Sequence, residues 1–220
     1  MKADQAIFTS INRRGKAGYQ LASRSPGVTD AEAAALTRWC PSHGGLIADD
    51  RNRVSVNFHA LPGGRYALSR TCEGRPEFSG RGGRQVYTRA VLFDADLLHR
   101  SSYRPFLIYR DALALGWLHY DPAPPAAVPR AELSTYFTKR TDQAEAATAR
   151  SLGLTVFDSV LSQLHAGQPV VLPYAGDRVA LAESLLARLE EECVRDLSFT
   201  TSLHPSTVRP FRLSVVAPGG

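Results

Sequence analysis

The chain has 220 residues, of which 44 % are hydrophobic, so it can bury a core as one large domain or two small subdomains. Lysine and arginine together number 26 against 21 acidic residues, a net charge of +5, and nearly all of the basic residues are arginine. No stretch approaches the roughly 18 consecutive apolar residues of a membrane-spanning helix, and the N-terminus has no apolar secretory segment. Cys40, Cys72 and Cys193 are too scattered for a disulfide framework. We therefore expect a cytoplasmic protein with reduced thiols.

The first forty residues predict a hairpin followed by a helix. Residues 5–11 alternate and are rich in β-branched side chains, which predicts a strand, and residues 18–24 predict the returning strand. A basic segment with two glycines forms the turn between them. Thr29 and Glu32 have the spacing of a capping box, so a helix is expected to begin there and to continue to Trp39.

The next segments predict more strands. Residues 53–60 and 65–71 alternate in polarity and flank a Pro-Gly-Gly turn, as in a hairpin. Residues 86–93 are more continuously apolar, which is typical of a central strand. Residues 105–109 predict another short strand. The first half of the chain is therefore expected to form a mostly antiparallel sheet.

A proline-rich connector separates the two halves of the chain. Residues 121–129 contain four prolines, which predicts an extended segment. It is the best candidate for a boundary between a strand-rich subdomain, residues 1–120, and a helix-rich subdomain, residues 121–220. The alternative is one continuous domain.

The second half is expected to be rich in helix. Residues 141–152 and 154–165 predict two helices that end before Gly167. Apolar residues at spacings of three and four, with Asp177 as the N-cap, predict a third helix at residues 179–194. Short strands are expected at residues 169–174, 197–202 and 209–216. A run of strands followed by a run of helices predicts an α+β fold rather than a regular doubly wound sheet.

The most distinctive segment is a basic, glycine-rich loop at residues 79–84, which leads into the predicted central strand. Its glycines free the backbone, and its arginines carry forked, permanently charged donors. The first hairpin turn is basic as well. The candidate partner-binding residues are Arg13, Arg14, Lys16, Arg75, Arg81 and Arg84. The alternative interpretation is an ordinary solvated hairpin tip.

Two carboxylates after the central strand suggest an enzymatic alternative. Asp94 and Asp96, with His99 one turn later, could hold a divalent metal in a nucleotide or nucleotide-sugar enzyme. Equally, Asp94 is a good helix N-cap and Asp96 suits the first turn of a helix. The chain has no G-x-S-x-G, H-E-x-x-H, phosphate-loop or G-x-G-x-x-G motif. We therefore assign no catalytic residue, cofactor or metal ligand, and prefer a non-catalytic role.

Several short phrases, in this order, resemble one bacterial family. They are QAIFTS (5–10), GYQ (18–20), SPG (25–27), CPSH (40–43), LPGGR (61–65), SGRGGR (79–84), VYT (86–88), LSFTTS (197–202) and RPF (209–211). The series resembles the N-terminal domain, second type, of the GTPase-associated proteins of bacterial conflict-system operons. Arg89 departs from the pattern, which would place a histidine there.

The resemblance implies association rather than catalysis, because such domains occur in multidomain proteins whose genes neighbour small GTPases, MoxR-type ATPases and von Willebrand A proteins. We accordingly expect a scaffold or adaptor domain that binds a protein partner, such as a GTPase or its associated ATPase. The alternatives are a metal-dependent enzyme using Asp94 and Asp96, and a nucleic-acid-binding domain that uses the basic turn and loop.

Overall fold

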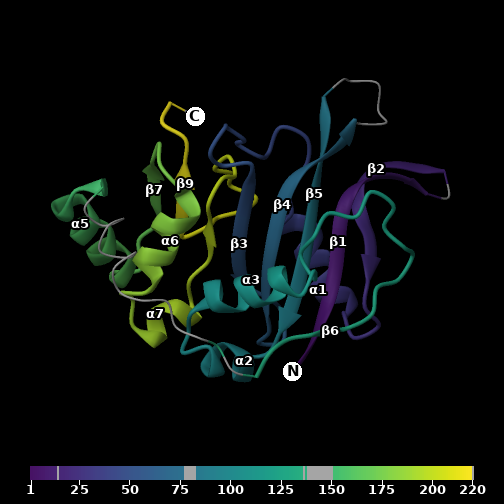
Figure 1. Ribbon diagram of the computed structural model, residues 1–220, viewed down its shortest axis with the longest axis horizontal. Helices are drawn as coiled ribbons and strands as arrows, with labels where there is room; N and C mark the ends of the chain where they lie inside the picture. Colours follow the sequence, from purple (N-terminus) through teal and green to yellow (C-terminus); the bar gives the residue numbers. More distant parts are fainter. Residues whose placement is uncertain (14, 77–82, 136, 138–150, 220) are drawn as a thin grey trace.

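The computed structural model describes residues 1–13, 15–76, 83–135, 137 and 151–219; for Lys16 only the backbone is described (Figure 1). Within these residues, nine strands form one mixed sheet in the order β2-β1-β5-β4-β3-β8-β9-β7, with β6 paired to β1. In Figure 1 this sheet runs across the whole molecule, and helices lie on both of its faces.

The strands of the first half form the antiparallel part of the sheet. Strands β1 (Lys2–Arg13) and β2 (Lys16–Arg24) make the first predicted hairpin, and β3 (Val54–Ala60) and β4 (Tyr66–Pro76) make the second. Strand β5 (Arg84–Phe93) lies between β1 and β4 and pairs with both. The prediction of a mostly antiparallel sheet here is confirmed, and β1, β4 and β5 are longer than expected.

Strands of the second half extend the same sheet. Strand β8 (Phe199–Thr200) pairs antiparallel with β3, whereas β9 (Leu213–Val216) is parallel to both β8 and β7 (Val170–Pro173). The short β6 (Ala131–Glu132) pairs with the beginning of β1. The mixed fold agrees with the predicted α+β class; the proposed division at residue 120 stays a prediction.

Helices cover the sheet on both sides. Helices α2 (Ala95–Arg100) and α3 (Pro105–Ala114) lie on the near face in Figure 1, as do α6 (Arg178–Leu186) and α7 (Glu191–Arg195). Helix α5 (Leu154–His165) lies beside β7 at one end of the sheet.

The main core lies between the near helices and the sheet, and it joins the two halves of the chain. Phe199 of β8 stacks on Phe58 of β3, with ring centroids 5.7 Å apart, and on Phe106 of α3 at 5.1 Å. All three rings are buried, and Leu185 of α6 belongs to the same cluster. Residues from both sides of the proline-rich connector thus share one hydrophobic core.

On the far face, α1 (Asp30–Trp39) is fixed by charged residues. Thr29 and Glu32 form the predicted capping box at its N-terminus. Arg65, which precedes β4, donates to the buried carboxylates of Glu32 at 3.1 Å and of Asp4 in β1 at 2.7 Å. A buried carboxylate needs a charged partner, and Arg65 serves both of them. The network therefore joins α1 to two segments of the sheet.

A row of buried polar side chains lies on the same far face. The side-chain nitrogen of Asn57 donates to the hydroxyls of Ser69 at 3.2 Å and Thr71 at 3.1 Å. Its oxygen accepts from the hydroxyls of Ser55 and Thr200, both at 2.7 Å. Since Asn57 is buried and all of its recorded partners lie on strands, this amide links β3, β4 and β8.

One predicted strand is wrong. Residues 105–109 form the first half of α3 instead. Proline is favoured in the first turn of a helix, where its missing N–H costs nothing, and Pro105 occupies such a position. The apolar run that follows is buried as part of the helix; a short apolar run has no periodicity that separates strand from helix.

The helix expected at 179–194 is two helices. Asp177 caps α6 as predicted, accepting from the backbone N–H of Ala180 at 2.9 Å, but α6 ends at Leu186. Glu191 and Glu192 therefore lie in the first turn of α7, where they favour the helix dipole rather than oppose it. Helix 154–165 is confirmed as α5, and residues 141–150 of the other predicted helix lie outside the described residues.

Strand β7 ends the sheet with an unusual edge. The backbone N–H groups of Val170 and Tyr174 donate toward β9, both at 2.8 Å. Because the backbone N–H groups of successive strand residues point alternately to the two neighbouring positions in the sheet, the N–H positions of residues 169, 171 and 173 point away from β9, toward the open edge. Pro169 and Pro173 have no N–H, so Val171 supplies the one outward donor of these three residues.

Candidate partner-binding surface

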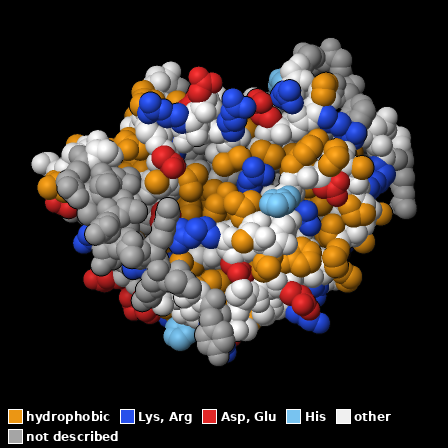
Figure 2. Space-filling model, viewed as in Figure 1, with side chains coloured by type: hydrophobic (Ala, Val, Ile, Leu, Met, Phe, Trp, Pro, Cys, Tyr) orange, Lys and Arg blue, Asp and Glu red, His pale blue; other side chains and the backbone are white. Residues whose placement is uncertain are grey.

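The antiparallel pairing brings the two basic segments to one end of the sheet. Strand β1 ends at Arg13 on the side where β5 begins, since Thr9 is opposite Tyr87 and the two strands run in opposite directions. Pro76, which precedes the glycine-rich loop, and Arg84, the last residue of that loop, are paired at this end. We call this part of the molecule the basic end; it lies toward the top of Figures 1 and 2. In Figure 2, lysine and arginine side chains recur along that margin.

Arg13 has a structural role at the basic end. Its guanidinium donates to the carbonyl of Ala22 at 2.5 Å and to that of Pro124 at 3.3 Å. It therefore ties the β1–β2 hairpin to the proline-rich connector. These two contacts give Arg13 a role within the fold that needs no binding partner. Arg13 therefore contributes less to the proposed surface than its position in a basic turn suggests.

Arg84 and Arg75 are the described arginines beside the glycine-rich loop. Arg84 is exposed and donates to the carbonyl of Gly74 at 3.0 Å, while its Nε lies 3.9 Å from Glu73. The backbone N–H of Arg75 donates to the Tyr120 hydroxyl at 3.1 Å. Arg14 and Arg81 lie outside the described residues, and the side chain of Lys16 is not described.

An open hollow of about 660 Å³ lies on the near face beside the basic end. Val54, Arg70 and Cys72 line it from β3 and β4, and the loop before β3 contributes Asp50 and Arg53. Tyr120, Glu73, Arg84, Asp49 and Ala48 complete the lining. We call this hollow the basin. Helix α3 lies lower on the same face, so this part of the sheet is not covered by a helix (Figure 1).

The basin was missed by the sequence analysis, although one signal could have found it. Tyr66 and Leu68 of β4 face the core, and Arg70 continues the same alternation. An arginine on the inward side of a predicted strand is exceptional, because a buried charge needs a partner or water. The alternation alone did not show that the helices stop short of this position.

The proposed metal ligands have other roles. Asp94 caps α2 by accepting from the backbone N–H of Leu97 at 3.0 Å, and Asp96 pairs with Arg100 at 2.9 Å. The ring of His99 packs edge-on against Tyr103. In the described part of the chain, no three His, Cys, Asp or Glu side chains gather closely enough to hold a metal ion. The arrangement thus matches the helix-capping alternative.

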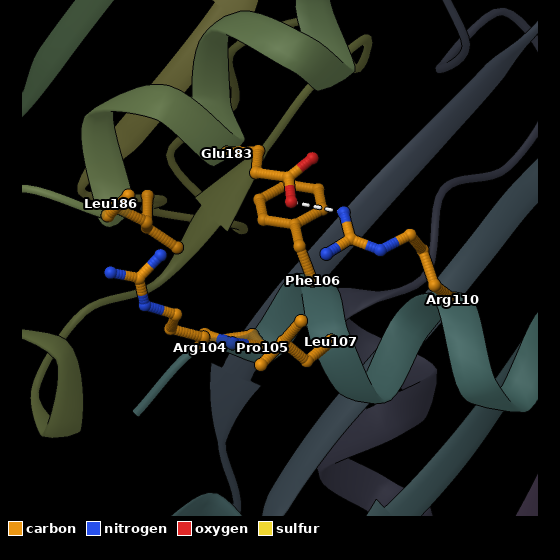
Figure 3. A pocket seen from close by; sticks show the side chains of 8 residues that line it. Arg104, Pro105, Phe106, Leu107, Arg110, Glu183 and Leu186 are labelled. Atoms are coloured by element: carbon orange, nitrogen blue, oxygen red, sulfur yellow. Dashed lines mark hydrogen bonds and ion pairs between the residues drawn. The ribbon is translucent and has the colours of Figure 1, made fainter. Parts of the chain in front are cut away.

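A second hollow is a narrow crevice between α3 and α6 (Figure 3). Phe106 and Leu107 line it from α3 and Leu186 from α6, and Arg110 forms an ion pair with Glu183 across it. Its walls belong to the packed contact between two helices. We attribute the crevice to helix packing rather than to ligand binding.

The described structure is thus a mixed α/β domain in which Arg13 and Arg84 lie at the same end of the sheet. No described helix is long and apolar enough to cross a membrane.

The family model of GTPase-associated protein 1, N-terminal domain type 2, matches residues 2–133. Because this is more than half of the chain, the protein belongs to that family. The phrases at 197–202 and 209–211 lie beyond the matched residues. Neither the curated proteins nor the solved structures that were searched gave a match.

Proposed function

We propose that this protein is a non-catalytic scaffold or adaptor domain of a bacterial conflict system, acting in the cytoplasm. Its partner would be a protein, such as a GTPase or an associated MoxR-type ATPase or von Willebrand A protein. The observation that carries the proposal is that β1 ends and β5 begins at the same end of the sheet, which brings the strand ends beside two basic segments together. Membership of a GTPase-associated family supports a protein partner.

The chemistry of this end favours recognition by charge. Arg75 and Arg84 are exposed. Arginine provides planar donors that match carboxylates on a partner, and it is enriched among interface hot spots. Arg84 is held at the base of the loop by Gly74, so its position is defined by the β4–β5 hairpin. Arg75, Arg81 and Lys16, with Arg14, would extend the surface, whereas Arg13 would support it from within.

The decisive experiment replaces both Arg81 and Arg84 with alanine. Binding is measured with purified products of the neighbouring genes, free of nucleotide and nucleic acid. Affinity should fall by about 30-fold or more, the size of a typical hot-spot loss, while the free energy of unfolding should change by no more than about 0.5 kcal/mol. The matched control replaces Arg38, in the last turn of α1, and Arg188, which follows α6; both are exposed. Unchanged affinity would leave the loop an ordinary hairpin tip.

The same residues would serve a nucleic-acid-binding domain, so salt dependence separates the two functions. Counterion release makes affinity for nucleic acid fall steeply as salt concentration rises. Tight oligonucleotide binding that has this dependence and is lost in the Arg81/Arg84 variant would favour nucleic acid over a protein partner.

A further inference from the structure

We propose that the basin binds a small molecule that carries a phosphate group, with Arg70 and Arg53 as its charged ligands. The basin lies on the open face of β3 and β4, and binding there requires no protein partner. The proposal therefore goes beyond the scaffold function, and each can fail without the other.

The first support is the position of Arg70 without an acidic partner. This half-buried side chain donates through Nη1 to the carbonyl of Leu118 at 3.4 Å and to the sulfur of Cys72 at 3.8 Å. The phenol of Tyr109 is also nearby; burial raises its pKa, and Arg70 opposes that effect. Within the described residues no carboxylate pairs with Arg70. A partly desolvated cation among neutral groups favours an anion.

The second support is a neighbouring arginine on the adjacent strand. Arg89 of β5 lies directly opposite Arg70. It donates to Gln5 at 2.8 Å and to the carbonyl of His119 at 3.4 Å, so its described partners are neutral as well. Like charges at opposite positions of neighbouring strands repel each other. Arg89 lies outside the lining of the basin, but an anion held by Arg70 would offset this repulsion. The carbonyls of Leu118 and His119, which the two arginines contact, carry no net charge.

The lining of the basin contains three acids and three arginines, but one of the acids is paired with an arginine outside the lining. Asp49 pairs with the buried Arg178 at 2.7 Å. Burial raises the pKa of Asp49, but hydrogen bonds from Asn52 and Arg51, with the Arg178 charge, lower it by more. Glu73 lies 3.9 Å from Arg84. Asp50 is therefore the one remaining negative charge beside the two positive charges of Arg53 and Arg70 in the lining. Arg53 makes no hydrogen bond or ion pair to any described residue.

The size and lining indicate the class of ligand. A hollow of about 660 Å³ is far larger than a single phosphate ion and lies within the range of roughly 300–1,000 Å³ that is typical of small-molecule sites. Guanidinium groups match phosphate oxygens with two parallel hydrogen bonds. The ring of Tyr120 lines the basin and offers a surface for the non-phosphate part of the ligand.

Calorimetry with pyrophosphate as the probe tests the proposal, at constant ionic strength set with chloride. Pyrophosphate should bind at one site, and citrate, which carries similar charge on carboxylates, should bind more weakly. Equal binding of citrate would overturn the assignment to phosphate. An absence of pyrophosphate binding under these conditions would overturn the site itself.

Variants locate the site. Arg70→Gln should weaken pyrophosphate binding by about tenfold or more, the effect of losing a charge-assisted hydrogen bond. Arg53→Gln should weaken it as well, and because this residue is exposed, the result remains decisive if Arg70→Gln does not fold. Asp50→Asn should strengthen binding by removing repulsion. Arg188→Gln, the same charge change at an exposed position outside the basin, should have no effect. Equal affinities in all four variants would overturn the proposal.

Discussion

His59 is buried on the far face of β3, where its ring stacks on Trp39 with centroids 4.5 Å apart. It is 4 % exposed, and its Nδ1 lies 3.0 Å from the carbonyl of Ala60, so the neutral tautomer carries its proton on Nδ1. Burial lowers the pKa of His59 to about 4, the Ala60 carbonyl opposes this shift, and the positive charge of Arg38 adds to it. The imidazole is therefore neutral in the folded protein at neutral pH.

This shift predicts a pH dependence of stability. The unfolded chain has a histidine pKa near 6.5 and takes up the proton first as pH falls. The stabilisation is thus complete above about pH 6.5 and is lost toward pH 4, with a loss of about 2–3 kcal/mol by pH 4.5. Urea unfolding at pH 7 and pH 4.5 should show a smaller loss for His59→Phe, which keeps an aromatic ring beside Trp39. Identical pH dependence in the two proteins would contradict the pKa.

Single residues were predictable where their role is local. The caps at Thr29, Asp94 and Asp177 follow from a few neighbouring residues, and all three form the expected contacts. Arg70 and Asn57 were not predictable in the same way. Their roles depend on which parts of each sheet face are covered, and that is decided by segments far away in the sequence.

Among the elements, α5 and β7 were predicted close to their observed bounds, but the apolar spacing of residues 179–193 did not show where α6 ends. Apolar residues continue at helical spacing past Leu186, and Leu189 still packs against the core although the helix is interrupted. The spacing therefore predicted burial correctly and continuity wrongly. In α3 the type of element was predicted wrongly, because the apolar run at residues 105–109 was too short to show whether its period was that of a strand or of a helix.

Helix α6 offers a direct test of its buried side. Leu186 is 3 % exposed and belongs to the main core. Leu186→Asp should cost several kcal/mol, because it buries an unpaired carboxylate, against a total stability of roughly 5–15 kcal/mol. Arg188→Asp, two residues further along and exposed, is the control and should unfold near the original temperature. A melting curve for Leu186→Asp like that of the control would show that α6 packs through another side.

At the scale of the whole molecule, the family match and the sheet end at different places. The match ends at residue 133, whereas β8, β9 and β7 extend the sheet with residues up to Val216. The β3–β8 pairing joins residues such as Asn57 and Thr200, and no local pattern in the sequence reports a pairing over that separation. The proline-rich connector suggested two subdomains or one continuous domain, and the sequence alone does not choose between them.

A fragment of residues 1–133 should therefore be unstable. It would lack Phe199, which stacks on Phe58, and Thr200, which donates to Asn57, and it would leave one edge of β3 open. We expect aggregation on size-exclusion chromatography and no cooperative unfolding by circular dichroism, in contrast to the full chain as control. A monomeric fragment with a sharp unfolding transition would show that the matched region folds alone.

The prolines beside the outer edge of β7 determine how copies of this molecule can meet. Sheets of separate molecules join, as in fibrils and exchanged dimers, when one edge supplies a regular series of N–H donors to the next. Pro169 and Pro173 interrupt that series at two of three positions, which disfavours pairing between molecules at this edge. A partner that approaches β7 finds a single outward backbone donor there, so its recognition depends mainly on side chains.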